Sequence, residues 1–373
     1  MHQEKKYIYL SGLNGLRTIA AVSVLLSHIA LSIKQFNVST YLFGLDEKGN
    51  PNSWYLGSMG VTIFFVLSGF LITYLLLLEQ EKGVINIKKF YIRRILRIWP
   101  IYYLYLFISL LFVYFIYNQV DLHSTLFYVF FAANIPFVFG FSLQFVDHFW
   151  SIGVEEQFYL FWPWLVKKIK KRLLLTVSVI ILFLIFTRLF LWWKFPFSDS
   201  AIFSIVNRFD CMMIGAIGAI LYYQKNGLFL KFVDNKISQV LAWGIIFLLA
   251  MNIKLVNSIV DTTLVAIVSL LLIVGQINIK NRIVNLDFPV FNFLGKISYG
   301  IYVYHVLIIY LVSLFLKDLQ TDDVFKTILV YLSIIATTVV VSYYSYELFE
   351  KRFIRLKDKF TVVKSTSSSS QNE

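Results

Sequence analysis

The sequence predicts an all-α protein, a polytopic membrane helical bundle of about ten transmembrane helices with a re-entrant or interfacial segment before the fourth. Two observations support this fold class. Of the 373 residues, 58% are hydrophobic and 15% are charged, a composition far from that of soluble domains. Apolar runs of about 20 residues, the length that a helix needs to cross a bilayer, also recur along the whole chain.

Ten of these apolar runs are expected to be membrane spans. The first is longer than the core of a signal peptide and no convincing small-residue cleavage site follows it, so we expect it to be retained. The expected spans lie at 13–33, 57–78, 100–117, 149–166, 173–193, 204–222, 237–252, 260–277, 293–315 and 325–345.

Residues 122–146, LHSTLFYVFFAANIPFVFGFSLQFV, form a further apolar run that we do not count as a span. Counting it would move the basic stretch KKIKKR to the outer side of the membrane, against the usual distribution of Lys and Arg. We therefore expect a re-entrant or interfacial segment on the outer side, packed in protein or lining a cavity. The Asn and Pro of ANIP favour a break there.

Lys and Arg cluster in alternate connections between the expected spans, at 82–97, 167–172, 225–236 and 351–364. The positive-inside rule then places both termini in the cytoplasm and makes the protein a multi-pass component of the plasma (inner) membrane. The net charge of +13 is mainly a topology signal, and we expect no nucleic-acid partner. One cysteine allows no internal disulfide, and no metal-site spacing is present.

Residues 1–360 are expected to form one membrane domain, and 361–373 a disordered cytoplasmic tail that ends in STSSSSQNE. No hydrolase-like domain follows the last expected span in this sequence, so we expect a single-module enzyme. Any relay step would then be direct or would need a partner. The sequence does not predict the oligomeric state.

The first expected span carries Arg17 and His28 within an apolar run. Eleven positions correspond to three helical turns plus roughly 20°, so both side chains project from one face, about 16 Å apart along the axis. Between them Ala20, Ala21 and Val24 leave a narrow path. The alternative interpretation is that Arg17 extends to lipid headgroups and His28 hydrogen-bonds another helix.

The fourth expected span places Ser151, Glu155 and Tyr159 on one helical face. Glu155 is expected about 9 Å below the outer boundary, near the depth of His28. A carboxylate beside an imidazole fixes its tautomer and raises its basicity, which suits a general base. The alternative for Glu155 and its neighbour Glu156 is a structural salt bridge or hydrogen bond.

Further polar residues are expected at or near the membrane. Arg94 and Arg97, at i and i+3, form a fork suited to phosphate, or else bind lipid headgroups and set topology. His305 lies in the outer half of the ninth span. We expect it to form a structural hydrogen bond, and the alternative is a catalytic role. Ser68 and Gly69 suggest close helix packing. Ser151, Arg208 and Asp210 are expected either to contact an acceptor or to be structural, the last two as an ion pair.

Together these residues describe a conduit for a thioester donor. The nucleotide end of acyl-coenzyme A would lie on cytoplasmic arginines, its pantetheine arm would enter the membrane, and the acyl group would reach a base that activates a hydroxyl arriving from outside. The donor would be acetyl-CoA or another acyl-CoA, with no permanently bound cofactor and no metal.

Seven motifs in order also resemble acyltransferase family 3, a family of integral membrane acyltransferases. The resemblance implies about ten spans and transfer of acetyl or related groups from cytoplasmic acyl-CoA to hydroxyls of bacterial cell-surface carbohydrates. The motifs are GLRTIAAVSVLLSH, GVTIFFVLSGFLI, FYIRRILRIWPIYY, HFWSIGVEEQFYLFWP, the RFD of NRFDCMMIG, ISYGIYVYH and YYSYELFEKRF.

The resemblance also implies roles for individual residues. It places the family's first-span Arg and His on Arg17 and His28, its Arg-x-x-Arg pair on Arg94 and Arg97, and the acid of its fourth-span motif on Glu155. Asn14 stands where the family commonly has Asp, which weakens any role at that position. Glu350, in the closing motif, is interpreted as structural.

The function predicted from the sequence is that of a membrane-embedded O-acyltransferase, with acetyl as the default group. His28 would be the general base, Glu155 its catalytic partner, and Arg17, Arg94 and Arg97 would bind the donor. The expected partners are acyl-CoA, a surface or lipid-linked glycan acceptor, and membrane lipids. The main alternative is a transporter or flippase for a glycan or lipid intermediate. A sensory or scaffold protein would leave the Arg17 and His28 spacing unexplained.

Overall fold

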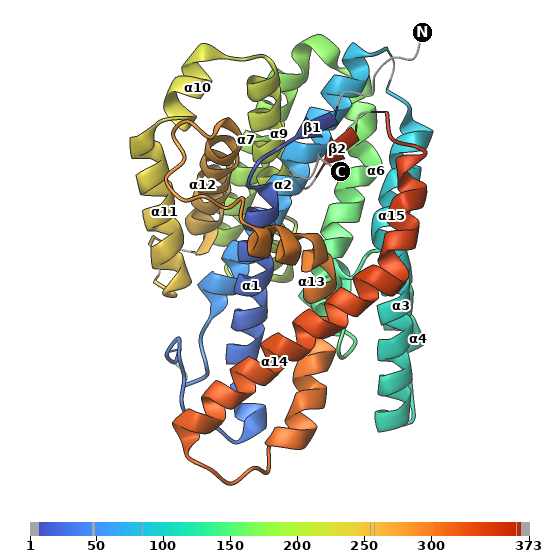
Figure 1. The fold of residues 1–373 in the computed structure, drawn as a ribbon, viewed down its shortest axis with the longest axis vertical. Helices are drawn as coiled ribbons and strands as arrows, with labels where there is room; N and C mark the ends of the chain where they lie inside the picture. The colour runs from blue at the N-terminus through green and yellow to red at the C-terminus, as the bar shows by residue number, and fades with distance from the viewer. Residues whose placement is uncertain are drawn as a thin grey trace.

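A computed structural model describes residues 7–46, 49–83, 85–253, 255–256, 258–362 and 364–366. Within these ranges the chain is a bundle of long helices with one very small sheet, so the predicted all-α fold class is confirmed (Figure 1). The bounds of the α-helices are α1 Leu13–Ser32, α2 Trp54–Glu81, α3 Ile87–Tyr117, α4 Leu122–Val129, α5 Asn134–Phe139, α6 Trp150–Lys168, α7 Leu173–Lys194, α8 Asp199–Val206, α9 Phe209–Tyr223, α10 Gly227–Val233, α11 Lys236–Ala250, α12 Ser258–Asn278, α13 Pro289–Leu316, α14 Asp323–Ser345 and α15 Lys351–Asp358.

Short elements complete the fold. Single 3-10 turns lie at Ile33–Phe36, Asp147–Phe149 and Lys170–Arg172, and a π turn at Tyr346–Glu350 joins α14 to α15. Strands β1 (Tyr7–Tyr9) and β2 (Lys364–Thr366) pair in parallel. Three residues of the tail expected to be disordered are therefore paired, while residues 367–373 lie outside the described residues, so the rest of that prediction stays open.

Helix ends follow the local sequence. Asn or Asp side chains cap the first turns of several helices by accepting a backbone N–H bond, as Asn86 does for α3 and Asp322 does for α14. Gly12 begins α1 with a φ of 72°, a left-handed conformation that suits glycine. Such caps supply partners to the N–H groups that the first helical turn leaves free.

Pro100, where the expected third span begins, does not separate that span from the basic segment before it. Helix α3 runs without interruption from Ile87 to Tyr117 and contains Pro100 in its interior. Proline removes one N–H bond and crowds the preceding turn, but membrane helices tolerate it when packed neighbours compensate. The basic segment and the third span are therefore one helix, which carries Arg94 and Arg97 directly to the bundle.

Eight described helical segments are long and apolar enough to cross a membrane, and α10 with α11 would make a ninth if this pair, bent by 52°, counts as one span. Helix α6 does not pass the same test, since Glu155, Glu156 and Gln157 interrupt its apolar sequence. The count of ten therefore stays a prediction. Residues 122–146 hold two short helices, α4 and α5, neither long enough to span, and their position relative to the membrane also stays a prediction.

Helix α2 lies at the centre of the bundle, where it packs against α1, α6, α9, α11 and α12. Glycines let α2 and α9 approach closely. A methyl group at Gly69 would overlap the carbonyl oxygen of Met212, and one at Gly215 would overlap that of Val66. The expected packing role of Gly69 is confirmed, because only a residue without a side chain fits this contact.

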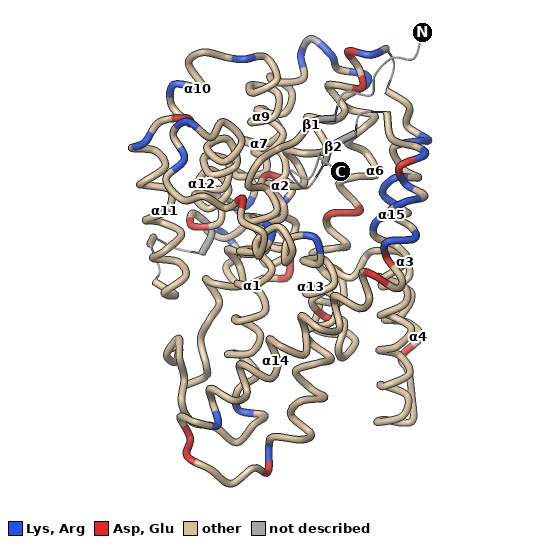
Figure 2. Tube along the Cα trace, viewed as in Figure 1, with Lys and Arg blue, Asp and Glu red and all other residues tan. Residues whose placement is uncertain are grey.

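Large apolar side chains cover the outside of the bundle, as an integral membrane protein requires. On α7, for example, Leu182, Phe183 and Phe186 are each about two-thirds exposed. Lys and Arg gather in the upper half of the molecule as drawn, over α10, α15 and the first part of α3 (Figure 2). The opposite end, formed by the ends of α1, α3, α13 and α14, carries few charges.

Candidate functional site

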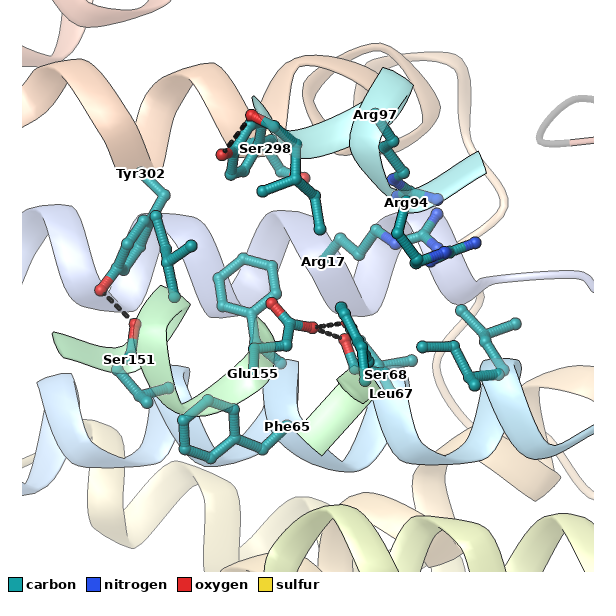
Figure 3. A pocket seen from close by; sticks show the side chains of 18 of the residues that line it. Arg17, Phe65, Leu67, Ser68, Arg94, Arg97, Ser151, Glu155, Ser298 and Tyr302 are labelled. Atoms are coloured by element: carbon teal, nitrogen blue, oxygen red, sulfur yellow. Dashed lines mark hydrogen bonds between the residues drawn. The ribbon is translucent and has the colours of Figure 1, made fainter. Parts of the chain in front are cut away.

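A cavity of about 1030 Å³ lies between α1, α2, α3, α6 and α13, and we call it the central cavity. Arg17, Arg94 and Arg97, from α1 and α3, gather at one end of it and define the arginine cluster (Figure 3). Ser151 and Tyr302 lie at the other end. The three arginines that the sequence singled out are thus brought together at one site.

The arginine cluster has few protein partners. Arg17 donates to the side-chain oxygen of Asn14 at 3.0 Å, and the Arg94 guanidinium lies 5.8 Å from the Tyr159 ring centre. Arg97 is exposed and lines the cavity. None of the three forms an ion pair within 4.0 Å with a carboxylate in the described part of the chain.

The neighbouring Arg93 shows a different environment. It is buried, forms an ion pair with Glu79 at 2.5 Å, and donates to the carbonyl of Phe360 at 3.1 Å. The charge of Arg93 is therefore neutralised by Glu79, whereas Arg94 and Arg97 have no carboxylate partner in the described chain and line the central cavity. The basic motif contains one structural arginine and two that face a cavity.

A second cavity of about 1000 Å³ adjoins the central one and shares Arg17 and Arg97 with it. It adds Lys296, Lys357 and Glu350 to the polar lining. Glu350 is buried and accepts a bond from Ser345 at 3.4 Å. The two cavities meet at Arg17 and Arg97, which line both of them, whereas Arg94 lines the central cavity alone.

Asp287 lies just before α13 and is hydrogen-bonded to Tyr9 and Asn292, two residues that line the second cavity. It accepts hydrogen bonds from Tyr9, from Asn292 at 2.9 Å and from Ser11 at 2.9 Å. Partial burial raises the pKa of Asp287, but these donors outweigh it and hold the pKa below its ordinary value. This network attaches the residues after β1 to the start of α13.

Glu155 is not hydrogen-bonded to His28, so of the two interpretations that the sequence left open for it, a hydrogen bond to other residues is the one formed. The Glu155 carboxylate accepts hydrogen bonds from the hydroxyls of Ser68 and Tyr159, within the central cavity (Figure 3). Ser68 therefore has a polar role that its expected packing role did not include. Helical spacing correctly placed Glu155 on the same face as Tyr159, which donates to it. It could not identify the second donor, Ser68, because that residue belongs to another helix, α2.

His28 instead contacts His305, from α13. The Nδ1 of His28 lies 2.5 Å from Nε2 of His305, and the two rings are stacked with centres 4.7 Å apart. Nδ1 of His305 lies 2.6 Å from the carbonyl oxygen of Tyr302. A carbonyl only accepts, so this Nδ1 must carry a proton.

The tautomers of the pair follow from this contact. In a neutral His305, Nε2 is then the acceptor, and Nδ1–H of His28 donates to it. Nε2 of His28 keeps its lone pair and has no hydrogen-bond partner among the described residues. The network thus assigns to His28 the form that can take up a proton.

A third histidine, His148, completes a histidine cluster with His28 and His305. Its ring centre lies 5.0 Å from that of His305 and 6.5 Å from that of His28. His148 was not among the site residues predicted from the sequence, although it lies immediately before the polar fourth expected span, which could have indicated a role in the site. The described residues contain no group of three His, Cys, Asp or Glu arranged to hold a metal ion.

Tyr302 and Ser151 separate the histidine cluster from the central cavity. The Tyr302 hydroxyl donates to the carbonyl of His148 at 2.6 Å, and Ser151 donates to the Tyr302 hydroxyl at 2.6 Å. The Tyr302 ring centre lies 5.8 Å from that of His305. His28 and His305 therefore lie behind this hydroxyl pair and do not line the central cavity.

Arg208 and Asp210 do not form an ion pair with each other, which was one of the two alternatives for them. Asp210 pairs with Arg188, from α7, at 2.5 Å, and both side chains are buried. Arg208 donates to Thr62 at 2.9 Å and lies over the Trp150 ring. Residues two positions apart on a helix point in different directions, so Asp210 contacts α7 and not Arg208. Both residues are structural in this geometry.

Comparison with known proteins identifies relatives along almost the whole chain. The model of a family described as an acyltransferase domain matches residues 10–347. A protein of Staphylococcus aureus (strain COL) with the provisional name O-acetyltransferase is 29% identical over 94% of this chain and 58% of its own length. The peptidoglycan O-acetyltransferase OatA of Listeria monocytogenes is 32% identical over 42% of this chain and 24% of its own length.

The chain spans less than two thirds of the length of these curated relatives. No solved structure matches it significantly.

Proposed function

This chain belongs to acyltransferase family 3, and from that premise we propose that it is a membrane-embedded O-acetyltransferase. It would move an acetyl group from cytoplasmic acetyl-CoA to a hydroxyl of an extracytoplasmic or lipid-linked carbohydrate. The observation that carries the proposal is the arrangement around the central cavity: three arginines without carboxylate partners at one end, and a preset imidazole pair behind the other. The names of the relatives favour a cell-wall glycan as acceptor.

The arginine cluster would bind the donor phosphates. Guanidinium groups match phosphate oxygens with two parallel hydrogen bonds, and a charge left unpaired beside a cavity favours an anionic ligand. The nucleotide part would occupy the second cavity, where Lys296 and Lys357 add positive charge. The thin pantetheine arm would then extend through the central cavity past Ser68 and Glu155.

His28 would act as the general base. Its Nε2 takes the proton of the acceptor hydroxyl, the hydroxyl oxygen attacks the thioester carbonyl, and the C–S bond breaks as the new C–O ester bond forms. The thiolate of coenzyme A takes up a proton and leaves as the thiol. His305 keeps the proton on Nδ1 of His28, which leaves Nε2 free for this step.

The reaction requires Tyr302 and Ser151 to part, because their hydroxyl pair lies between the central cavity and the histidines. Glu155 would act as a positioning residue that holds the hydroxyls of Ser68 and Tyr159 along the path of the donor. It would not share a proton with His28. The predicted catalytic pair of His28 and Glu155 thus becomes His28 and His305 in this proposal.

The orientation in the membrane is part of the proposal. Lys and Arg gather in the half of the molecule that contains β1, β2 and α15, which supports a cytoplasmic position for that half and for both termini (Figure 2). The plasma membrane is the place where cytoplasmic acetyl-CoA and an extracytoplasmic glycan meet across one bilayer. The acceptor would then approach the histidine cluster from the opposite end.

The test is turnover by purified protein in proteoliposomes, with labelled acetyl-CoA and a cell-wall glycan fraction. His28→Ala should abolish ester formation, whereas His123→Ala, at an exposed histidine of α4, should retain it. Wild-type turnover by His28→Ala would contradict the assigned base. Movement of a labelled glycan across the vesicles without acetyl-CoA would support the transporter alternative instead.

A further inference from the structure

A separate cavity of about 1350 Å³ lies on the far side of the histidine cluster, and we call it the distal cavity. It shares no lining residue with the central cavity. Its wall includes residues next to each histidine: Ser32 lies four positions after His28, Asp147 precedes His148, and Val306 follows His305. It therefore approaches the histidine cluster from the side opposite the donor.

The lining of the distal cavity includes polar side chains with few protein partners, although Oδ1 of Asp147 accepts the backbone N–H of His148 at 2.9 Å. The side-chain amides of Gln35 and Gln144 make no hydrogen bond within the described ranges, and each can donate and accept. The Asp147 side chain is 54% exposed. Tyr117 and Tyr310 add aromatic rings to the same wall. Free amides, a carboxylate and ring faces are groups that bind a sugar through its hydroxyls, its acetamido groups and its apolar C–H face.

His148 supplies an independent sign of a missing ligand. Its side chain is buried, and its Nε2 lies 3.2 Å from the carbonyl of Val303. Its Nδ1 is buried with no hydrogen-bond partner in the described chain, and Oδ1 of Asp147 lies 3.8 Å away. The Val303 carbonyl can only accept, so Nε2 of a neutral His148 carries the proton and Nδ1 is an acceptor, as the carboxylate is. A buried polar atom without a partner is costly, and an O–H or N–H group of a ligand would supply the donor that Nδ1 lacks.

We propose that the distal cavity is the acceptor site and that it binds an oligosaccharide carrying acetamido groups. This rests on the proposed function. Gln35 and Gln144 contact the acetamido and hydroxyl groups, and a sugar ring packs on Tyr310. Asp147 and Nδ1 of His148 each accept from a different O–H or N–H group of the sugar, which places a further hydroxyl beside Nε2 of His28, the atom that removes its proton. Donor and acceptor then reach the reaction from opposite ends without sharing a cavity.

The test uses purified full-length protein in nanodiscs and chitotetraose, a β-1,4-linked tetramer of N-acetylglucosamine, as the acceptor probe. Binding is first titrated without donor by intrinsic fluorescence, and turnover is then followed with acetyl-CoA. Gln144→Ala and Asp147→Asn should each weaken binding and raise the KM for chitotetraose about tenfold. The KM for acetyl-CoA should not change, because the cavities share no residue.

Gln224→Ala is the matched control, since Gln224 is exposed at the end of α9 and lines none of the three cavities. Gln35→Ala gives a second variant at the other wall, and thermal unfolding confirms that each variant folds. Unchanged binding and KM in Gln144→Ala and Asp147→Asn, or no binding by wild type, would overturn the acceptor site. Binding that these variants weaken, in a wild-type protein that never consumes acetyl-CoA, would support the site and refute the enzyme proposal.

Discussion

Arg17 and His28 lie on α1 and belong to two clusters, the arginine cluster and the histidine cluster, whose polar atoms are satisfied in opposite ways. The arginines have almost no protein partners and open into two cavities. The histidines are held by one another and by backbone carbonyls, and His148 and His305 are buried. The first arrangement suits capture of a charged ligand, and the second suits a base whose tautomer is set in advance.

The largest expected effect concerns the histidine end. His305→Phe keeps a ring stacked on His28 but removes the acceptor for Nδ1–H of that residue. We expect kcat to fall by about 10²- to 10⁴-fold while the KM for acetyl-CoA is unchanged, since general-base catalysis contributes that much. Steady-state kinetics in proteoliposomes measures both constants.

His305→Gln sharpens this test, because its amide oxygen can still accept the proton from His28. We expect it to recover part of the lost kcat, whereas a purely structural role would give both variants the same activity. His123→Phe is the matched control at an exposed histidine. Equal kcat for His305→Phe and wild type would remove His305 from the mechanism.

The next effect concerns the arginine end. Arg94→Gln combined with Arg97→Gln should raise the KM for acetyl-CoA by about 10- to 100-fold, because hydrogen bonds to charged groups contribute about 1.5 to 3 kcal/mol each. The double variant Lys88→Gln and Lys89→Gln removes the same charge from exposed positions of α3. If both double variants change the KM equally, the arginines set only topology and general potential.

A smaller effect is expected at Tyr302 and Ser151, which lie between the central cavity and the histidine cluster. Tyr302→Phe removes the hydroxyl that joins Ser151 to the His148 carbonyl. Loss of these neutral hydrogen bonds should make the pair part more easily and raise acetyl-CoA hydrolysis without acceptor by about 2- to 10-fold. Tyr103→Phe is a matched control, since that hydroxyl also donates to a backbone carbonyl, at 2.8 Å from Val129. A lower hydrolysis rate in Tyr302→Phe would argue against a separating role.

The smallest effect is expected at Asp287, just before α13. The folded-state pKa of Asp287 lies below its ordinary value, so the carboxylate stabilises the fold above its unfolded pKa of about 3.9. This contribution is lost as the pH falls through the folded pKa. Asp287→Asn should therefore lower the Tm by a few degrees at pH 7, with the difference shrinking near pH 3. An equal difference at both pH values would assign the effect to packing.

The sequence was sufficient for features that depend on one helix. The same-face spacing of Arg17 and His28, the fork of Arg94 and Arg97, and the all-α class all follow from helical period and hydropathy. The partners did not follow, because they come from distant segments: His305 lies 277 positions from His28, and Ser68 lies 87 positions from Glu155. Periodicity identifies a face, whereas packing determines what that face meets.

The parallel pairing of β1 with β2 also constrains the topology. Hydrogen-bonded strands cannot lie on opposite sides of a bilayer, so Tyr7–Tyr9 and Lys364–Thr366 share one side. The number of membrane crossings between them must then be even. Eight crossings satisfy this parity, and so do ten, but nine do not. Helix α6 and the bent pair of α10 and α11 must therefore cross together or not at all, and one labelled loop between them would decide for both.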